Sequence, residues 1–166
     1  HMKVKELMST GITCIMENTP VALAALYMKK DNVGSMPVCD SAGHLKGIVT
    51  DRDIVLRALA CENSDSSESA LSIPVSDIMT CDPVTVSSDM SVHDAALLFS
   101  SYQIRRLPVT EASKLVGMLS LGDVAAKPVC IDEAGDALSS ISAASSTDVP
   151  RSENRSHVFQ GRRDPR

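Results

Sequence analysis

Aromatic residues are the scarcest class in this 166-residue chain: it has no tryptophan, two tyrosines and two phenylalanines. The hydrophobic fraction is nevertheless 43%, which is ordinary for a globular protein. The core must therefore be built from Val, Ile, Leu, Ala and Met. Such a composition suits small helices packed closely on small sheets, with methionine filling irregular gaps.

Excess basic charge and long apolar runs are also missing. The formal net charge is −5 at pH 7, which argues against a nucleic-acid partner. No apolar run approaches the length of a membrane span, and no signal peptide is predicted in the opening MKVKELM. We therefore expect a cytoplasmic protein with neither a nucleic-acid nor a membrane partner.

Paired cysteine motifs are absent as well. Cysteines occur singly, and no two have the C-x-x-C spacing of a redox motif or a zinc knuckle. An odd number of isolated cysteines fits a reducing cytosol. We expect each to be a small core or surface residue. The five are Cys14, Cys39, Cys61, Cys81 and Cys130.

The sequence carries none of the common catalytic signatures. It has no G-x-x-x-x-G-K-[ST] loop, no G-x-G-x-x-G and no nucleophile-elbow context. His44 and His93 have no partner at metal-ligand spacing. These absences exclude a kinase or dehydrogenase with its usual phosphate loop. We expect no catalytic residue, no metal and no required cofactor.

The chain does contain an internal repeat. When its two halves are aligned, apolar, proline, glycine and acidic positions coincide, with one residue lost in a turn. The matched pairs include Val4 with Val75, Met8 with Met79, Val21 with Val92, Pro37 with Pro108, Gly47 with Gly117, and Asp53 with Asp123. We therefore predict two repeats, over residues 3–60 and 74–126.

Each repeat shows the order strand, helix, strand, strand, helix. β-rich runs, GITCI and PVTVS, precede apolar residues at helical spacing, and two further strands and a closing helix follow. The apolar helical face comprises Val21, Ala24, Ala25 and Met28 in the first copy and Val92, Ala95, Ala96 and Phe99 in the second. One unit of about fifty residues can barely bury its own apolar faces, whereas two packed together can.

Capping signals mark the start of the first helix in each repeat. Thr19 is predicted to cap the helix of the first copy, with Pro20 at the favoured first helical position. Ser91 and Asp94 have capping-box spacing in the second copy.

The remaining segments are polar. Residues 61–73 read as a Ser-rich linker. Residues 127–144 form a C-terminal extension in which a short helix is predicted. Residues 145–166 have almost no apolar side chains and are predicted to be disordered, with a vector-derived origin for the last of them left open.

A hydroxyl and a carboxylate recur at one junction in both repeats. Thr50 precedes Asp53, and Ser120 precedes Asp123, each with the spacing [ST]-x-x-D between the last strand and the closing helix. One interpretation is a helix capping box. The other is a ligand site, because a helix start attracts phosphate and a carboxylate can accept both hydroxyls of a ribose. The two interpretations are compatible.

At these residues the sequence resembles a known family. GIVTDRDIV and GMLSLGDVA, which follow MPV and LPV, are similar to paired CBS domains, the Bateman module, over residues 3 to about 126. The whole chain resembles small bacterial proteins that contain little more than a CBS pair. The resemblance implies an α+β fold of two pseudo-symmetric βαββα repeats packed through their small sheets. It also implies a homodimer that forms a disc of four repeats.

The resemblance further implies two clefts for an adenosyl ligand: AMP, ADP, ATP or S-adenosylmethionine. In the family, each cleft takes its Asp and Thr or Ser from one repeat, and its adenine wall and phosphate contacts largely from the other. Carried over, cleft one comprises Thr50, Asp53, Thr85, Arg105, Arg106, Leu107 and Pro108. Cleft two comprises Thr13, Ser35, Met36, Pro37, Ser120 and Asp123.

The two clefts are predicted to differ in charge. Arg105 and Arg106 align with Gly34 and Ser35. Cleft one would therefore gain two guanidinium groups suited to phosphate, and cleft two none. On this basis cleft one is expected to be the better nucleotide site. The alternative is that the arginine pair is a solvated strand edge.

Three functions stay open at this point. The leading hypothesis is a regulatory sensor in which an adenosyl ligand changes dimer packing, which an unidentified partner protein reads. The second is a structural or interaction protein of the same fold with degenerate, non-binding clefts. The third, an enzyme, is disfavoured because CBS pairs in enzymes such as IMP dehydrogenase accompany a catalytic domain that is absent here.

Overall fold

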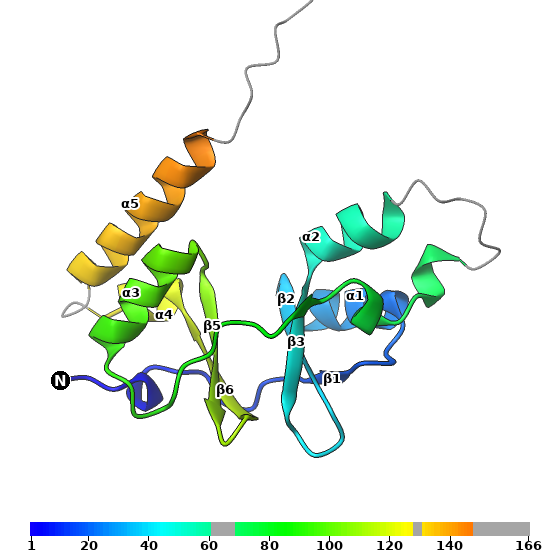
Figure 1. Ribbon diagram of the computed structural model, residues 1–166, viewed down its shortest axis with the longest axis horizontal. Coiled ribbons are helices and arrows are strands. Elements are labelled where there is room, and N and C mark those ends of the chain that lie inside the picture. The colour runs from blue at the N-terminus through cyan, green and yellow to red at the C-terminus, as the bar shows by residue number, and fades with distance from the viewer. Residues whose placement is uncertain (61–68, 128–130, 148–166) are drawn as a thin grey trace, which may run out of the picture.

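The computed structural model describes residues 1–60, 69–127 and 131–147, and it confirms the predicted α+β fold. Two halves lie side by side, each with a small sheet flanked by helices (Figure 1).

The first repeat contains β1 (Ile15–Met16), α1 (Val21–Asp31), β2 (Ser35–Cys39), β3 (Leu45–Thr50), α2 (Asp51–Asp53) and the π-helical turn η2 (Ile54–Leu59). The second contains β4 (Thr80–Cys81), α3 (Val92–Tyr102), β5 (Arg106–Glu111), β6 (Lys114–Ser120), α4 (Leu121–Ala125) and α5 (Ile131–Thr147). Short 3₁₀ turns are η1 (Val4–Glu6), η3 (Ala70–Ser72) and η4 (Val75–Asp77).

The two sheets share one layout. In the first, the strand order is β1-β2-β3-β4; β1 is parallel to β2, and the other pairs are antiparallel. In the second, β5 and β6 are antiparallel. Isolated pairings extend that sheet on both sides: Val86 lies parallel to Val109, and Ser9 lies antiparallel to Met118. The sequence repeat is therefore also a repeat of strand pairing.

One edge of each sheet is completed by the other repeat. β4, at the start of the second repeat, pairs with β3 through Gly47 and Ile48. Ser9, at the start of the first repeat, pairs with Met118 on β6. We call these two donated stretches, residues 3–9 and 74–81, the exchanged segments. Figure 1 shows the N-terminal one starting beside α3 before the chain crosses to β1.

The exchange also completes the two hydrophobic cores. Val75, Ile78 and Met79 are buried among the residues of the first repeat, together with Val21, Met36 and other side chains of α1, β2 and β3. Val4 is fully buried in the core of the second repeat, beside Phe99. Each hydrophobic core therefore consists of most of one sequence repeat together with the exchanged segment of the other repeat.

Glycine is required where each exchanged segment crosses a strand. A Cβ at Gly47 would lie 2.6 Å from the Thr80 carbonyl oxygen. A Cβ at Gly117, the matching position on β6, would lie 2.9 Å from the Ser9 carbonyl oxygen and 2.7 Å from Met8 Sδ. The pseudo-symmetry thus extends to these two close approaches of backbone to a glycine.

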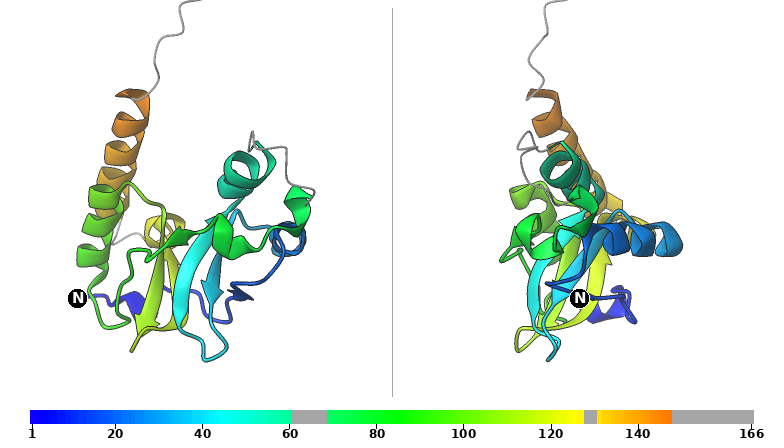
Figure 2. Two further views of the ribbon diagram at one scale, coloured as in Figure 1. Left: turned by 45° about the vertical axis from the view of Figure 1, so that its right-hand side comes forward. Right: turned by 90° about the vertical axis from the view of Figure 1, so that its right-hand side faces the viewer.

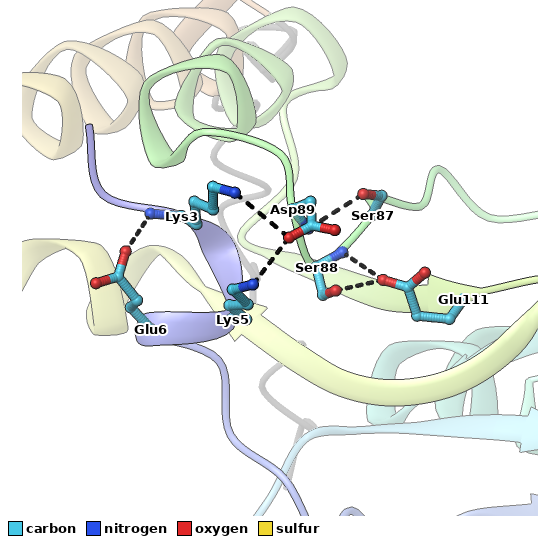
Figure 3. Close-up of polar contacts among 7 residues, drawn as sticks. All are labelled: Lys3, Lys5, Glu6, Ser87, Ser88, Asp89 and Glu111. Carbon is cyan, nitrogen blue, oxygen red and sulfur yellow. Dashed lines mark hydrogen bonds and ion pairs between the residues drawn. The ribbon is translucent and has the colours of Figure 1, made fainter.

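A polar cluster fastens the N-terminal exchanged segment to the second repeat (Figure 3). Lys5 Nζ lies 2.9 Å from Asp89 Oδ1, and Lys3 Nζ lies 3.6 Å from the same oxygen. The backbone N–H groups of Ser88 and Lys5 add bonds, from Ser88 to Glu111 Oε1 and from Lys5 to the Ser88 carbonyl. The hydrogen bond with Lys5 lowers the pKa of Asp89 and raises the pKa of Lys5.

The helix starts differ in part from the prediction. Pro20, not Thr19, is the N-cap of α1, and the proline ring has no oxygen that could accept a backbone N–H, so the helix has no side-chain cap. Thr19 Oγ1 instead accepts the N–H of Met16 at 3.2 Å. At α3, Ser91 is the N-cap, and its side chain accepts the N–H of Asp94 at 3.1 Å.

The predicted apolar faces are mostly buried. All four residues of the α3 face lie in the core, but on α1 only Val21, Ala24 and Met28 do, and Ala25 is exposed. These faces therefore pack within the module and leave little apolar surface on α1 and α3 from the predicted stripe.

The predicted linker and tail fall partly outside the described residues, at 61–68 and 148–166. Within the linker, Ala70–Ser72 forms η3, and the carbonyl of Ile73 accepts the N–H of Val21. Helix α5 lies against α3 and α4 (Figure 2) and runs to Thr147, so it extends past residue 145, where the tail was predicted to begin. None of the helices described is long and apolar enough to cross a membrane.

Replacing Gly47 or Gly117 by alanine should destabilise the fold by about 1–3 kcal/mol, because the added methyl group overlaps a backbone oxygen of an exchanged segment. The measurement is the free energy of unfolding in urea. Gly135→Ala in α5 is the matched control, since a Cβ there meets nothing within 4 Å beyond its chain neighbours and the nearby backbone of its own helix. That control should be neutral or up to about 1 kcal/mol more stable. Equal effects at Gly47 and Gly135 would contradict the close approach.

The contact between Lys5 and Asp89 should make stability depend on pH. Folding lowers the pKa of Asp89, so its contribution is fully present above the unfolded carboxyl's pKa of about 3.9. It is lost as pH falls through the lower folded-state value. Asp89→Asn should therefore be less stable than wild type at neutral pH, and the difference in stability should shrink as the pH falls below the ordinary carboxyl pKa and through the lowered pKa of folded Asp89. A difference that stays constant over this range would refute the assignment.

Candidate functional site

The two predicted hydroxyl–carboxylate junctions form reciprocal capping boxes. Thr50 N–H donates to Asp53 Oδ2 at 2.9 Å, and Asp53 N–H donates to Thr50 Oγ1 at 3.0 Å. Ser120 and Asp123 make the same pair of bonds at 2.8 and 3.0 Å. The capping interpretation is therefore confirmed at both sites. In each box, the bond to the backbone uses Oδ2 and leaves Oδ1 for another partner.

The second oxygen of each aspartate differs in environment. Asp53 Oδ1 lies 3.7 Å from Arg57 Nε, and Arg57 also donates to the Ile78 carbonyl at 3.2 Å. Lys127 occupies the position in the second repeat that matches Arg57. Within residues 1–60, 69–127 and 131–147, no basic group pairs with Asp123. Asp123 Oδ1 is thus more available to a ligand than Asp53 Oδ1.

One cavity gathers every residue predicted for cleft two. Its volume is about 510 Å³, and it lies between the segment before β1, the start of β2 and the junction of β6 with α4. The predicted residues that line it are Thr13, Ser35, Met36, Pro37, Ser120 and Asp123. Residues that the sequence did not single out, among them Gly11, Ile12, Asp31 and Val33, complete the wall.

Arg106 also lines cleft two, so the prediction that this cleft has no guanidinium group is wrong. The reason is positional. Arg106 opens β5 as Ser35 opens β2, and both residues border the same cavity. A long side chain at this shared border serves the second cleft, which the alignment of the two copies did not reveal.

Arg105 faces a different cavity. With Arg106, it lines a space of about 580 Å³ between α4 and α5, together with Leu121 and Leu138. Its carbonyl accepts the N–H of Leu121 at 2.9 Å. Arg106 therefore lines both cavities, whereas Arg105 lines only the one between α4 and α5.

The other residues predicted for cleft one lie in two groups. Thr50 and Asp53 are at the end of β3, where Thr50 pairs with Ser35 of β2. Leu107 and Pro108 are buried in β5, and the exposed Thr85 precedes Val86, whose N–H donates to the Pro108 carbonyl. The structure thus supports a common cavity for the cleft two set more strongly than for the cleft one set.

Ser35 adds a buried hydroxyl, unpaired among the residues described, to the cleft two wall. Its Oγ is buried and makes no hydrogen bond within the described part of the chain. An unpaired buried hydroxyl costs free energy that a partner would recover. The hydroxyl belongs to a residue of the cleft two wall.

A disulfide joins Cys14 to Cys39, so the expectation of five isolated cysteines is wrong for this pair. The two residues are 25 positions apart and have no motif spacing. The parallel pairing of β1 with β2 brings them together, because Ile15 lies opposite Val38 and Met16 opposite Cys39. Since disulfides are rare in a reducing cytosol, the cysteine argument for a cytoplasmic location no longer holds.

Both histidines singled out in the sequence contact a carboxylate. His44 Nδ1 lies 3.1 Å from Asp40 Oδ2, and His93 Nδ1 lies 3.8 Å from Glu133 Oε1. The hydrogen bond from the His44 backbone N–H is the main cause of a lowered pKa at Asp40. The residues described contain no group of three or more His, Cys, Asp or Glu arranged to hold a metal.

Comparisons with known proteins agree with this architecture. The CBS domain family model matches twice, at residues 4–59 and 75–135. The CBS domain-containing protein YhcV of Bacillus subtilis is 40% identical over 139 residues, which cover 84% of this chain and 94% of YhcV.

Solved structures show the same likeness. CBSX2 of Arabidopsis thaliana, solved in complex with AMP, has a TM-score of 0.66 and 28% identity, covering 80% of this chain and 99% of that one. The CBS domain pair of MJ0100, solved with 5-methylthioadenosine and S-adenosyl-L-methionine, has a TM-score of 0.64 and 28% identity, covering 75% and 94%. With two matched repeats, a fold of two exchanged halves and relatives of similar length, this chain belongs to the CBS domain family as a tandem CBS pair.

Proposed function

We propose that this chain is a regulatory module that binds an adenosyl ligand in cleft two. The observation that carries the proposal is the cavity of about 510 Å³ to which both repeats contribute polar side chains. Support for the ligand class comes from CBSX2, solved with AMP, and from the MJ0100 pair, solved with S-adenosyl-L-methionine. In this proposal AMP, ADP, ATP or S-adenosylmethionine acts as a regulatory ligand and not as a cofactor for catalysis.

The chemistry of the wall suggests a role for each side chain. Asp123 Oδ1 can accept ribose hydroxyls, because Oδ2 already holds the Ser120 N–H. Arg106 can bind a phosphate, and the Ser35 hydroxyl can donate to an oxygen of the ligand. Met36 and Pro37 offer an apolar wall for a flat base.

Cleft one is the weaker site in this proposal, which reverses the order that the sequence predicted. Its aspartate, Asp53, has one oxygen in the capping box and the other beside Arg57. A ligand at cleft one would have to displace or share Arg57. A ligand at cleft two would not have to displace any basic side chain of the described residues from Asp123.

We also propose that two copies pair through η2. Its side chains Val55, Leu56 and Leu59 are 50–55% exposed and are spaced to share one face of the turn. The candidate is η2 because three exposed apolar side chains follow one another within its six residues, although α1 also exposes Leu26 and α3 exposes Leu97. Ligand binding at the neighbouring helix starts could then alter how the copies pack.

Asp123→Asn should separate ligand binding from folding. Asparagine retains an oxygen that can accept the Ser120 N–H, so stability should change by less than about 1 kcal/mol. AMP affinity should fall about 10- to 100-fold, because a charged acceptor for the ribose is lost. Isothermal titration with AMP and S-adenosylmethionine measures the change.

Asp53→Asn is the matched control and should have a smaller effect on AMP affinity. Arg106→Ala should weaken AMP more than S-adenosylmethionine, which carries no phosphate. The competing function, an interaction module with non-binding clefts, is favoured if wild type binds none of AMP, ATP and S-adenosylmethionine. Unchanged AMP affinity in Asp123→Asn would also reject the assignment of cleft two.

The double variant Leu56→Glu/Leu59→Glu should convert a dimer into a monomer in light scattering, because two charges would be buried at the interface. Leu97→Glu is the control, since Leu97 is 54% exposed and lies on α3 of the second repeat, outside the proposed η2 interface. It should leave the dimer intact. A wild-type monomer, or a double variant that stays dimeric, would refute the η2 interface.

A further inference from the structure

The Cys14–Cys39 disulfide connects two walls of cleft two. Cys14 follows Thr13, and Gly11, Ile12 and Thr13 form one wall of the cavity. Cys39 ends β2, whose first residues, Ser35 to Pro37, form the facing wall. The covalent bond thus fixes one wall relative to the other.

Few other bonds hold the wall before β1. Ser9 is fixed by two hydrogen bonds with Met118, at 2.9 and 3.0 Å. β1 begins at Ile15 and pairs with β2 through only two residues. Between Ser9 and Ile15, a stretch that the structure describes throughout, the chain pairs with no strand. The disulfide is therefore the main restraint on the residues that face the ligand cavity.

The second repeat lacks this restraint. In the alignment of the two copies, Cys14 corresponds to Thr85 and Cys39 to Thr110. The strand pairing is conserved, because Val86 pairs with Val109 as Ile15 pairs with Val38. Only one of two similar walls is therefore cross-linked, and it is the wall of the cavity that the proposed function uses.

The two cysteine residues differ in exposure. Cys14 is exposed, whereas Cys39 is 4% exposed. A dithiol reductant can attack Cys14 Sγ as a thiolate and form a mixed disulfide, with Cys39 as the leaving thiolate. The second thiol of the reductant then displaces Cys14. The reductant gives up two electrons and two protons and becomes a disulfide, and the protein gains two thiols.

We propose that this disulfide is a redox control on cleft two. Reduction releases the wall of residues 10–14 and lowers the affinity of cleft two for its ligand, while cleft one is unaffected. The effect on affinity rests on the proposed function, whereas the release of the wall does not. The structure thus assigns to the pair Cys14–Cys39 a regulatory modification in addition to a structural bond.

The test uses the full chain with Cys61, Cys81 and Cys130 replaced by serine, so that only the proposed pair responds. Oxidised protein and protein treated with dithiothreitol are compared. The expected result is an AMP affinity about tenfold weaker after reduction, because an unrestrained wall must be ordered again on binding. Cys14→Ser in the same background should bind like the reduced protein and should not respond to dithiothreitol.

A second readout needs no ligand. Thermolysin cleaves before apolar residues, and reduction should accelerate its cleavage before Ile12 and Ile15. As a gain-of-function control, Thr85→Cys/Thr110→Cys should place a reducible bond at the matching wall of the second repeat. Reduction should then speed cleavage before Val84 and Val86.

The outcomes separate the two proposals. Equal AMP affinity in the oxidised and reduced states overturns the redox control and leaves the binding function intact. Failure of both states to bind AMP, ATP and S-adenosylmethionine overturns the binding function and, with it, control of affinity. Unchanged thermolysin cleavage on reduction overturns the release of the wall in either case.

Discussion

The pairing of each exchanged segment with the sheet of the other repeat is the interaction on which the rest of the structure depends. β4 completes the sheet of the first repeat, and the pairing at Ser9 completes that of the second. These contacts bring the closing helix of one repeat near the opening strands of the other. Cleft two exists because of this, since Thr13 and Ser35 come from one repeat and Asp123 from the other.

The capping boxes link folding to the site. The atoms that satisfy the helix starts, Ser120 Oγ and Asp123 Oδ2, belong to residues that line the cavity. A box that holds the carboxylate in one orientation also fixes the direction of its second oxygen. Order in the site is therefore supplied by the same bonds that begin α4, and a ligand meets a carboxylate that is already oriented.

Much of this architecture could be predicted from the sequence, because it follows from local patterns. Helical spacing gave the helices, the matched pairs gave the repeat, and the [ST]-x-x-D junctions gave the capping boxes. The exchange could not be predicted, because apolar side chains such as those of the exchanged segments can pack into either core, and the sequence does not specify which. The pairing of Cys14 with Cys39 and the reach of Arg106 into cleft two depend on tertiary geometry, which has no signature in spacing.

The exchange has a consequence for how the chain folds. The core of the first repeat contains Val75, Ile78 and Met79, which are synthesised after the whole of that repeat. The core of the second contains Val4, which is synthesised first. Neither core is complete without residues of the other repeat. During translation, the sheet of the first repeat therefore keeps an unpaired edge until β4 has been synthesised. The first half can close its sheet at that point, whereas the second half must pack onto a segment made at the start of the chain, so each half depends on residues of the other to complete its core.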